Sequence, residues 1–132
     1  MMKELLEEIN KKFKIYHGNG VSNDEIDNAE KELALSFSEE YKEYLREIGC
    51  MSFASHEFTG LGFSGYLNVV EATKSERNLD DRFPKNCILI ENVGIDGLLI
   101  LHDKTGAVYS YVNGNKAKIS NSLFDFLKSL HE

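Results

Sequence analysis

The chain has 132 residues, a formal net charge of −7 and an isoelectric point near 5.1. Nucleic acids select basic surfaces, so this charge argues against a nucleic-acid partner, and a hydrophobic content of 42% argues against disorder. The length suits one domain and no proline-rich or low-complexity linker interrupts it, so we expect a single domain over residues 1–132.

The N-terminal segment is predicted to be a helix. Leu5, Leu6, Ile9 and Phe13 recur on one helical stripe, with charged residues between them. A secretory signal would instead show a basic head followed by an apolar core. No apolar run approaches the roughly 18 residues that a membrane span needs. We therefore expect a cytoplasmic protein with no membrane partner.

Two short acidic helices are predicted within residues 21–49. Ser22 and Glu25 have the spacing of a capping box at the start of the first helix. Glu30 borders the apolar stripe of that helix, so we expect its carboxylate to accept backbone N–H groups from a neighbouring loop. Gly49 stands where the second helix needs a left-handed residue to end. The residues expected to face inward are Ile26, Ala29, Leu33, Tyr41, Leu45 and Ile48.

The pattern changes to strands and turns after residue 49. Strand-like runs are predicted at 51–55, 57–63, 87–93, 98–102, 107–112 and 117–119, with a short helix at 69–75. Asp96 and Gly97 are assigned to a tight turn, because the other oxygen ligands of a Ca²⁺ loop are missing. Ser120 or Asn121 is expected to cap a last helix. We predict an α+β fold: a central, mostly antiparallel sheet of about five to six strands, flanked by N-terminal helices and a C-terminal helix.

Residues with catalytic or metal-binding chemistry are scattered along the chain. The residues that could be imagined as a nucleophile and base set are His56 with Glu57, His102 with Asp103, and Cys87. No catalytic motif accompanies them, so we expect no enzyme and no catalytic residues. The histidines stand singly at positions 17, 56, 102 and 131, and we expect no metal or cofactor. Cys50 and Cys87 lack zinc or redox spacing and are expected to be free, reduced and buried.

Loose patterns along most of the chain keep a common order, from an I-x-x-A-E element to a closing S-F-x-x-F-L type of helix. The residues that carry them are Ile26, Ala29, Glu30, Leu33, Tyr41, Leu45, Gly49, Gly60 or Gly62, Asn68, Val69, Val70, Asp96, Gly97, Asp103, Gly106, Val108, Tyr109, Ser122, Leu123, Phe126 and Leu127. In this order they resemble the SMI1/KNR4 family, or SUKH superfamily. Ser38 departs from the family's usual proline, although serine also begins helices well.

The resemblance implies a binding protein without catalytic residues. Bacterial members of the family are mostly immunity proteins against secreted polymorphic or contact-dependent toxins, which are often nucleases. We therefore expect an immunity protein that neutralises a cognate toxin by stoichiometric binding. The alternative is a non-enzymatic interaction scaffold or regulatory module, as in the fungal relatives.

The acidic residues suggest two surfaces for a basic toxin. Residues 24–47 hold nine acids and only three bases, which accounts for most of the net charge of −7. An acidic surface can occupy the phosphate site of a nuclease and accelerate encounter with it. The candidate toxin-binding residues are Glu39, Glu43 and Glu47 on the second helix, and Glu57, Asp80 and Asp81 in loops beside the sheet. For any one glutamate, a solvated surface is the commoner role.

Overall fold

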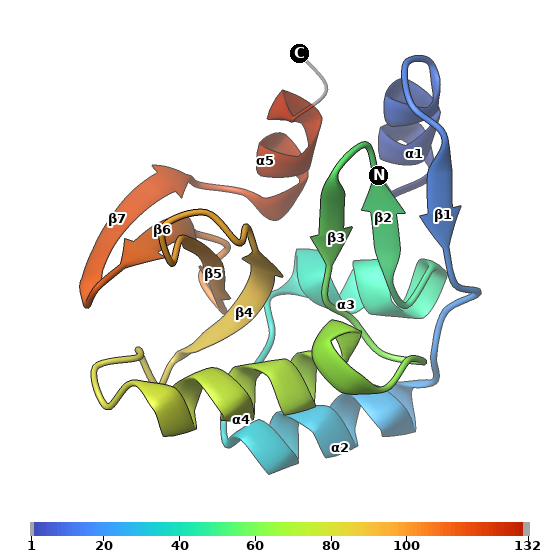
Figure 1. The fold of residues 1–132 in the computed structure, drawn as a ribbon. Coiled ribbons are helices and arrows are strands. Elements are labelled where there is room, and N and C mark those ends of the chain that lie inside the picture. The colour runs from blue at the N-terminus through green and yellow to red at the C-terminus, as the bar shows by residue number, and fades with distance from the viewer. Residues whose placement is uncertain (1, 131–132) are drawn as a thin grey trace.

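The computed structural model of the protein describes residues 2–130. Its elements are α1 (Met2–Asn10), β1 (Ile15–His17), α2 (Asn23–Leu33), α3 (Glu39–Glu47), β2 (Met51–Phe53), β3 (His56–Phe58), the 3-10 helix η1 (Gly65–Leu67), α4 (Val69–Leu79), β4 (Cys87–Asn92), β5 (Leu99–Asp103), β6 (Val108–Val112), β7 (Asn115–Ser120) and α5 (Leu123–Ser129). The predicted α+β class is confirmed, with antiparallel strands between the first and last helices (Figure 1).

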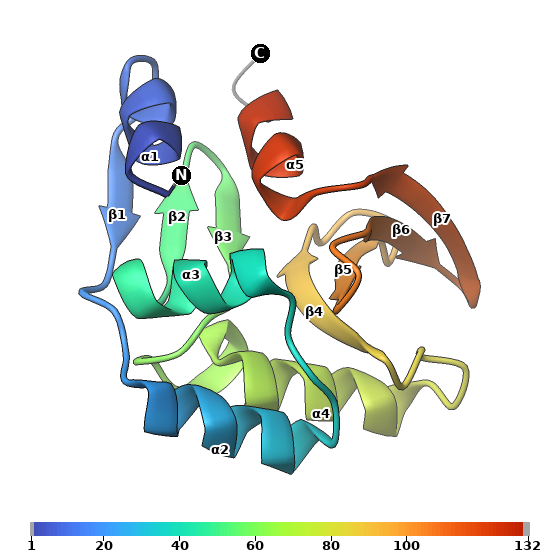
Figure 2. The ribbon, with the colours of Figure 1, turned by 180° about the vertical axis from the view of Figure 1, so that it is seen from behind.

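The strands form two antiparallel sheets in place of one central sheet, in the orders β1-β2-β3 and β4-β5-β6-β7. A bulge in β4 takes Ile90 out of the ladder with β5, and the Ile90 carbonyl accepts the backbone N–H of Thr59 at 2.9 Å. The Thr59 hydroxyl also donates to the Leu89 carbonyl at 2.6 Å. The two sheets therefore meet at β3 and β4 through these contacts instead of a regular ladder (Figure 2).

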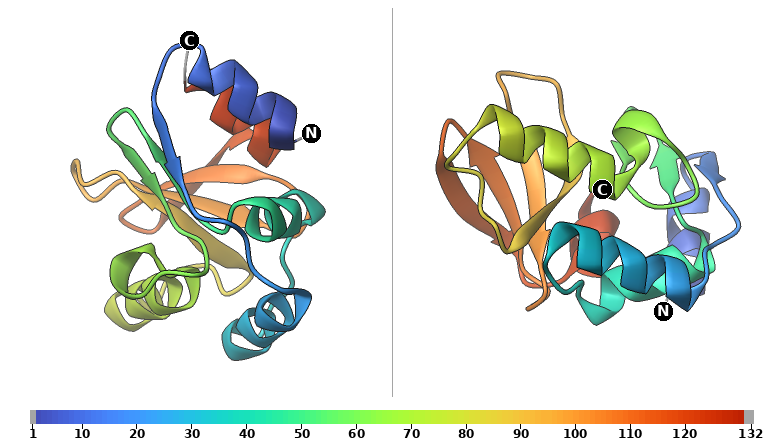
Figure 3. Two further views of the ribbon diagram at one scale, coloured as in Figure 1. Left: turned by 90° about the vertical axis from the view of Figure 1, so that its right-hand side faces the viewer. Right: turned by 90° about the horizontal axis from the view of Figure 1, so that it is seen from below.

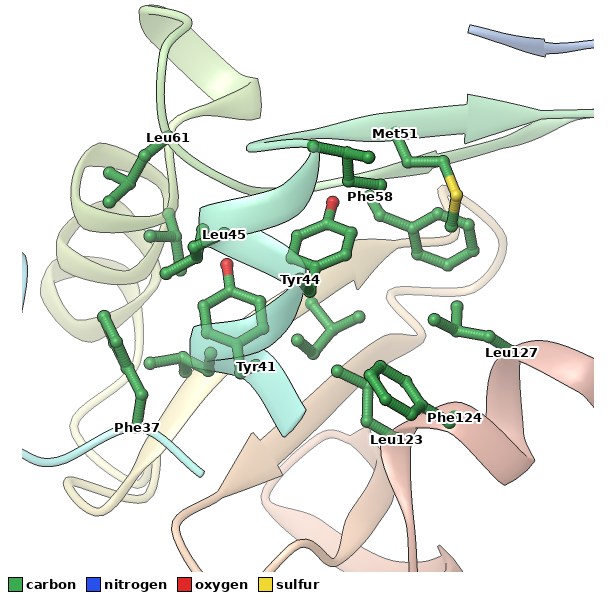
Figure 4. Close-up of a cluster of buried hydrophobic side chains, with 14 of the residues drawn as sticks. Phe37, Tyr41, Tyr44, Leu45, Met51, Phe58, Leu61, Leu123, Phe124 and Leu127 are labelled. Atoms are coloured by element: carbon green, nitrogen blue, oxygen red, sulfur yellow. The ribbon is translucent and has the colours of Figure 1, made fainter. Parts of the chain in front are cut away.

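The main core lies between the two sheets and takes buried side chains from all five α-helices of the described residues. α1 and α5 lie side by side at one end of the molecule, and α2 lies beside α4 at the other (Figure 3). From α3, the Tyr41 and Tyr44 rings stack 5.3 Å apart, and both hydroxyls donate to the Thr59 carbonyl (Figure 4). Because these buried hydroxyls have an acceptor, α3 can fill the core with tyrosine and also bind the junction between the sheets.

Both faces of β4 are covered. Ile88 and Ile90 belong to the main core, whereas Cys87 and Leu89 pack in a smaller cluster that includes Ala72 of α4. This double burial explains why β4 reads as a continuous apolar run, where a strand with one solvent face would alternate. It also fixes α4 against the sheet, close to the junction with β3.

Four local predictions differ from the structure. The strand expected at 57–63 is only His56–Phe58. Strand β1 was not predicted, because three residues at a sheet edge give too short a pattern to recognise. Helix α4 runs to Leu79, beyond the predicted end at residue 75, after a cap in which the Asn68 side chain accepts two backbone N–H groups. Ser122, and not Ser120 or Asn121, caps α5; β7 continues through Ser120, which leaves its backbone in the sheet.

Candidate functional site

A groove of about 470 Å³ lies between α4, η1 and the junction of β3 with β4. We call it the α4 groove. Its lining residues are Glu57, Thr59, Gly65, Tyr66, Leu67, Glu71, Ala72, Ser75, Glu76, Leu79, Leu89 and Asn92. The surrounding elements lie far apart in the sequence and meet only because β3 and α4 both pack along β4 (Figure 1).

The groove has a buried floor and an exposed apolar rim. Thr59, Ala72 and Leu89 are buried, whereas Tyr66 is 69% exposed and Leu79 is 78% exposed. Exposed apolar side chains gathered beside a hollow mark an interaction surface, and tyrosine is among the commonest anchors of protein interfaces. The arrangement suits contact with another protein.

The charged residues of the groove are all acidic. Of the described residues that line it, Glu57, Glu71 and Glu76 are the charged ones. The Tyr66 hydroxyl donates to Glu57 at 3.0 Å. Burial, together with the charge of Asp80, raises the pKa of Glu76. A cation placed beside Glu76 would favour its charged form, so the groove is electrostatically suited to a lysine or arginine side chain.

The helical period of α4 produces this acidic face. Glu71, Ser75 and Leu79 follow one another at four-residue spacing and line the groove, with Glu76 beside them. The basic residues of α4 are engaged elsewhere. Lys74 lies 3.7 Å from Glu32 of α2, and Arg77 donates to the carbonyl of Lys85 at 3.1 Å.

A smaller hollow of about 200 Å³ shares Glu76 and Leu79 with the α4 groove. Asp80 lines it, but its carboxylate accepts bonds from the Tyr111 hydroxyl at 2.7 Å and from the backbone and side chain of Arg82. The Tyr111 bond, followed by those from Arg82, lowers the pKa of Asp80 to about 2. Asp80 is therefore an organising residue of this hollow, with its charge already partly compensated.

The second group of predicted toxin-binding residues lies near these hollows, although Glu57, expected in a loop, belongs to strand β3. Glu57 lines the α4 groove and Asp80 lines the smaller hollow next to it. Asp81 is exposed at the adjacent position in the chain. Their role in binding a toxin stays a prediction.

The helical residues of that set lie on α3 and line neither hollow. Glu39 and Glu47 are exposed. Glu43 is half-buried, and its carboxylate accepts the backbone N–H of Met2 at 2.8 Å, which joins α3 to the start of α1. Binding of a toxin by these three residues also stays a prediction.

Other acids near α3 have backbone partners. Glu40 accepts the N–H of Leu123 at 2.8 Å and the hydroxyl of Ser122, at the start of α5. Glu30 accepts the N–H of Phe37 at 2.7 Å, in the loop before α3. These carboxylates satisfy backbone donors that helix ends and loops leave unpaired.

The residues expected to shape turns adopt left-handed backbone angles. Gly49 has a φ of +77° at the end of α3. Asp96 and Gly97 have φ values of +52° and +75° in the turn between β4 and β5. A left-handed conformation favours glycine, and aspartate tolerates it better than most residues.

A serine–histidine pair is present, but it is closed to substrate. The Nδ1 of His102 lies 3.0 Å from the carbonyl of Ala107 and must donate to it, so Nε2 accepts the Ser38 hydroxyl at 2.6 Å. Ser38 is 4% exposed and His102 is 1% exposed, and the Ser38 oxygen also caps α3 by accepting the N–H of Tyr41. Burial lowers the pKa of His102. The pair fastens α3 to the second sheet.

The residues of the other imagined catalytic pairs bond to other side chains. His56 lies 2.8 Å from Glu91, not against Glu57. Asp103 accepts the hydroxyls of Thr105 and Tyr109. Burial would raise the pKa of Asp103, but these hydrogen bonds outweigh it and hold the pKa below its usual value.

Cys50 and Cys87 are free and buried, as predicted. Burial raises the pKa of Cys87 to about 11, so this thiol is a weak nucleophile. Within residues 2–130, no group of three or more His, Cys, Asp or Glu side chains is placed to hold a metal ion; His131 lies outside the described residues. No helix in that range is both long and apolar enough to cross a membrane.

The lining residues that were not singled out from the sequence include the exposed and acidic ones, Tyr66, Glu71, Glu76 and Leu79. Ending the predicted helix at residue 75 hid the i, i+4, i+8 series that places three side chains of α4 along the groove. A helix extended to residue 79 would have shown an acidic and apolar face next to Tyr66.

A family model described as SMI1-KNR4 cell-wall matches residues 2–132 of the chain. No curated protein sequence matches the chain. The matched range includes every element that builds the α4 groove.

Proposed function

This chain belongs to the SMI1/KNR4 (SUKH) family, and we propose that it is an immunity protein that binds and neutralises a toxin. Binding is stoichiometric and needs no cofactor. The partner we propose is a basic toxin domain such as a nuclease, which the protein binds in the cytoplasm. The observation that carries this proposal is the α4 groove, where carboxylates and exposed apolar side chains meet in one hollow.

The groove supports the proposal through charge. A nuclease must hold phosphates, so its active site is basic, and an acidic partner can cover that site. Lysine and arginine side chains of such a surface could pair with Glu57, Glu71 and Glu76 in the groove. Tyr66 and Leu79 on the rim supply apolar contact that charge alone would not provide.

We propose that the protein acts without catalytic turnover. The Ser38–His102 pair, which has the chemistry of a nucleophile and base, is buried and engaged in fixing α3. Family membership fits a protein-interaction role. The same membership suits an interaction scaffold that inhibits nothing, and experiment separates these two roles.

Co-expression with the neighbouring open reading frame tests the proposal. If that frame encodes a toxin, the natural chain should restore growth, and the purified proteins should form a complex with a fixed ratio. A groove variant, Glu57→Lys with Glu76→Lys, should lose protection. Glu39→Lys with Glu47→Lys makes the same change of charge on α3 and should retain protection; its loss there would instead assign binding to the α3 surface that the sequence also suggested. Complex formation without restored growth or inhibition would support the scaffold role instead.

A further inference from the structure

A third hollow lies across residues 63–67 from the α4 groove. It has a volume of about 240 Å³ and includes Tyr16 and His17 of β1, Met51 and Ser52 of β2, and Phe63. We call it the β1 hollow. Leu67 lines both hollows, so residues 63–67 form a ridge between them.

The ridge and its surroundings expose three aromatic rings. Tyr16 is 61% exposed, Phe63 is 45% exposed and Tyr66 is 69% exposed. Phe63 and Tyr66 belong to the ridge, and Tyr16 shares the β1 hollow with Phe63. Apolar side chains gathered around adjoining hollows mark an interaction surface more strongly than single exposed ones do.

Hydrogen bonds on both sides hold the ridge in place. The Asn68 side chain donates to the Phe63 carbonyl at 2.9 Å, and the Glu71 carboxylate accepts the Gly65 N–H at 2.8 Å. The Tyr66 hydroxyl reaches Glu57 of β3. A ridge fixed in this way loses little conformational entropy when a partner binds, which favours affinity.

We propose that one segment of the partner straddles this ridge, with an apolar side chain in the β1 hollow and a lysine or arginine in the α4 groove. The proposal rests on the proposed function, because it takes the toxin as the partner. Charge complementarity assigns the basic side chain to the groove, whose charged lining residues are glutamates. The exposed Tyr16 and Phe63 rings assign the apolar side chain to the other hollow.

The two contacts have different consequences for binding. Apolar contact at the centre of an interface mainly slows dissociation, whereas charge attraction mainly accelerates association and weakens in salt. A segment that makes both contacts must carry its basic and apolar side chains at a fixed separation. The ridge thus provides specificity that an acidic surface alone lacks.

The test uses an inactive form of the toxin encoded by the neighbouring reading frame, with dissociation constants and rate constants measured by surface plasmon resonance. Three variants are compared with the natural chain: Tyr16→Ser with Phe63→Ser, Tyr16→Ser alone, and Glu57→Gln with Glu76→Gln. Ile95→Ser is the matched control, because Ile95 is 65% exposed in the turn between β4 and β5 and lines neither hollow. Circular dichroism verifies that each variant is folded.

We expect the aromatic variants to raise the dissociation constant about tenfold or more through faster dissociation. The glutamine variant should slow association and reduce its dependence on salt, and Ile95→Ser should bind within about twofold of the natural chain. Tight binding by the natural chain that Tyr16→Ser and the double aromatic variant leave unchanged would overturn the inference alone. Absence of binding by the natural chain would overturn the proposed function together with it. If the natural chain forms a dimer and Tyr16→Ser abolishes it, the exposed rings around the ridge bind a second copy of the chain, which would also overturn the inference.

Discussion

Three glutamates around α3 and two glutamates of the α4 groove carry the same charge but have different partners. Glu30, Glu40 and Glu43 each accept a backbone N–H from another segment of the chain. Glu57 and Glu76 instead line an open hollow, where burial raises the pKa of Glu76. A count of acids along the sequence therefore locates charge, whereas their contacts separate residues that hold the fold from residues available to a partner.

The largest effect is expected where the two regions touch, at Gly60. A Cβ added there would lie 1.8 Å from the carbonyl oxygen of Gly49, at the end of α3, so the backbone would have to move. We expect Gly60→Ala to lower the free energy of unfolding by about 3 kcal/mol or more. Chemical denaturation measures this loss.

Gly94→Ala is the matched control for Gly60→Ala. Gly94 has a φ of +78°, but an added Cβ would meet nothing within 4 Å. Its loss of stability should stay near the cost of a left-handed alanine, about 1–2 kcal/mol. Equal losses for the two variants would show that the contact between Gly49 and Gly60 is not tight.

Removing a carboxylate should separate, by their effect on the free energy of unfolding, the glutamates around α3 that bond to backbone from one that is exposed. We expect Glu40→Ala to lower the free energy of unfolding by about 2–3 kcal/mol and Glu30→Ala by about 1–3 kcal/mol, because each leaves a backbone donor unpaired. Glu47 is exposed at the end of α3, so Glu47→Ala should change the free energy of unfolding by less than about 0.5 kcal/mol. The same denaturation experiment ranks the three, and a larger loss for Glu47→Ala would contradict the structural role of the first two.

The region around α3 should also be sensitive to pH through His102. Burial lowers the pKa of His102 in the folded state, so the unfolded chain binds the proton more readily. The stability that His102 contributes is complete above about pH 6.5 and falls as the pH decreases toward the folded-state pKa. His102 alone can contribute a slope of up to about 1.4 kcal/mol per pH unit.

A His102→Asn variant isolates this contribution. It should be less stable at pH 7, because the contacts to Ser38 and Ala107 are disturbed, but it should lose less further stability between pH 7 and pH 5. Denaturation at several pH values measures both slopes. Parallel slopes would mean that His102 does not titrate differently in the folded and unfolded states.

The elements that sequence predicted well are those fixed by local spacing. Ser22 caps α2, and Ile26, Ala29 and Leu33 are buried on one face, because capping and helical period act within a few residues. The division into two sheets depends on the bulge at Ile90 and on Thr59, which is 31 positions away in the chain, and no local pattern encodes that pairing.

The candidate site divides in the same way. The sequence drew attention to Glu57 and Asp80 as acids near the sheet, but not to Glu76, whose position follows from a longer α4 and from packing against β4. The sequence also gave no sign that Glu43 contacts Met2, because the partners are 41 residues apart. Charge is visible locally, whereas the choice between a structural and a surface role depends on the tertiary fold.

The association rate with the toxin domain tests the central claim most directly. Stopped-flow measurement at low and high salt compares Glu57→Lys with Glu76→Lys against Glu39→Lys with Glu47→Lys, which makes the same change of charge on α3. We predict that the groove variant slows association about tenfold or more and shows a weaker dependence on salt, while the α3 variant stays within about threefold of the natural chain. A larger loss for the α3 variant, or no loss for the groove variant, would contradict the assignment of the α4 groove as the binding site.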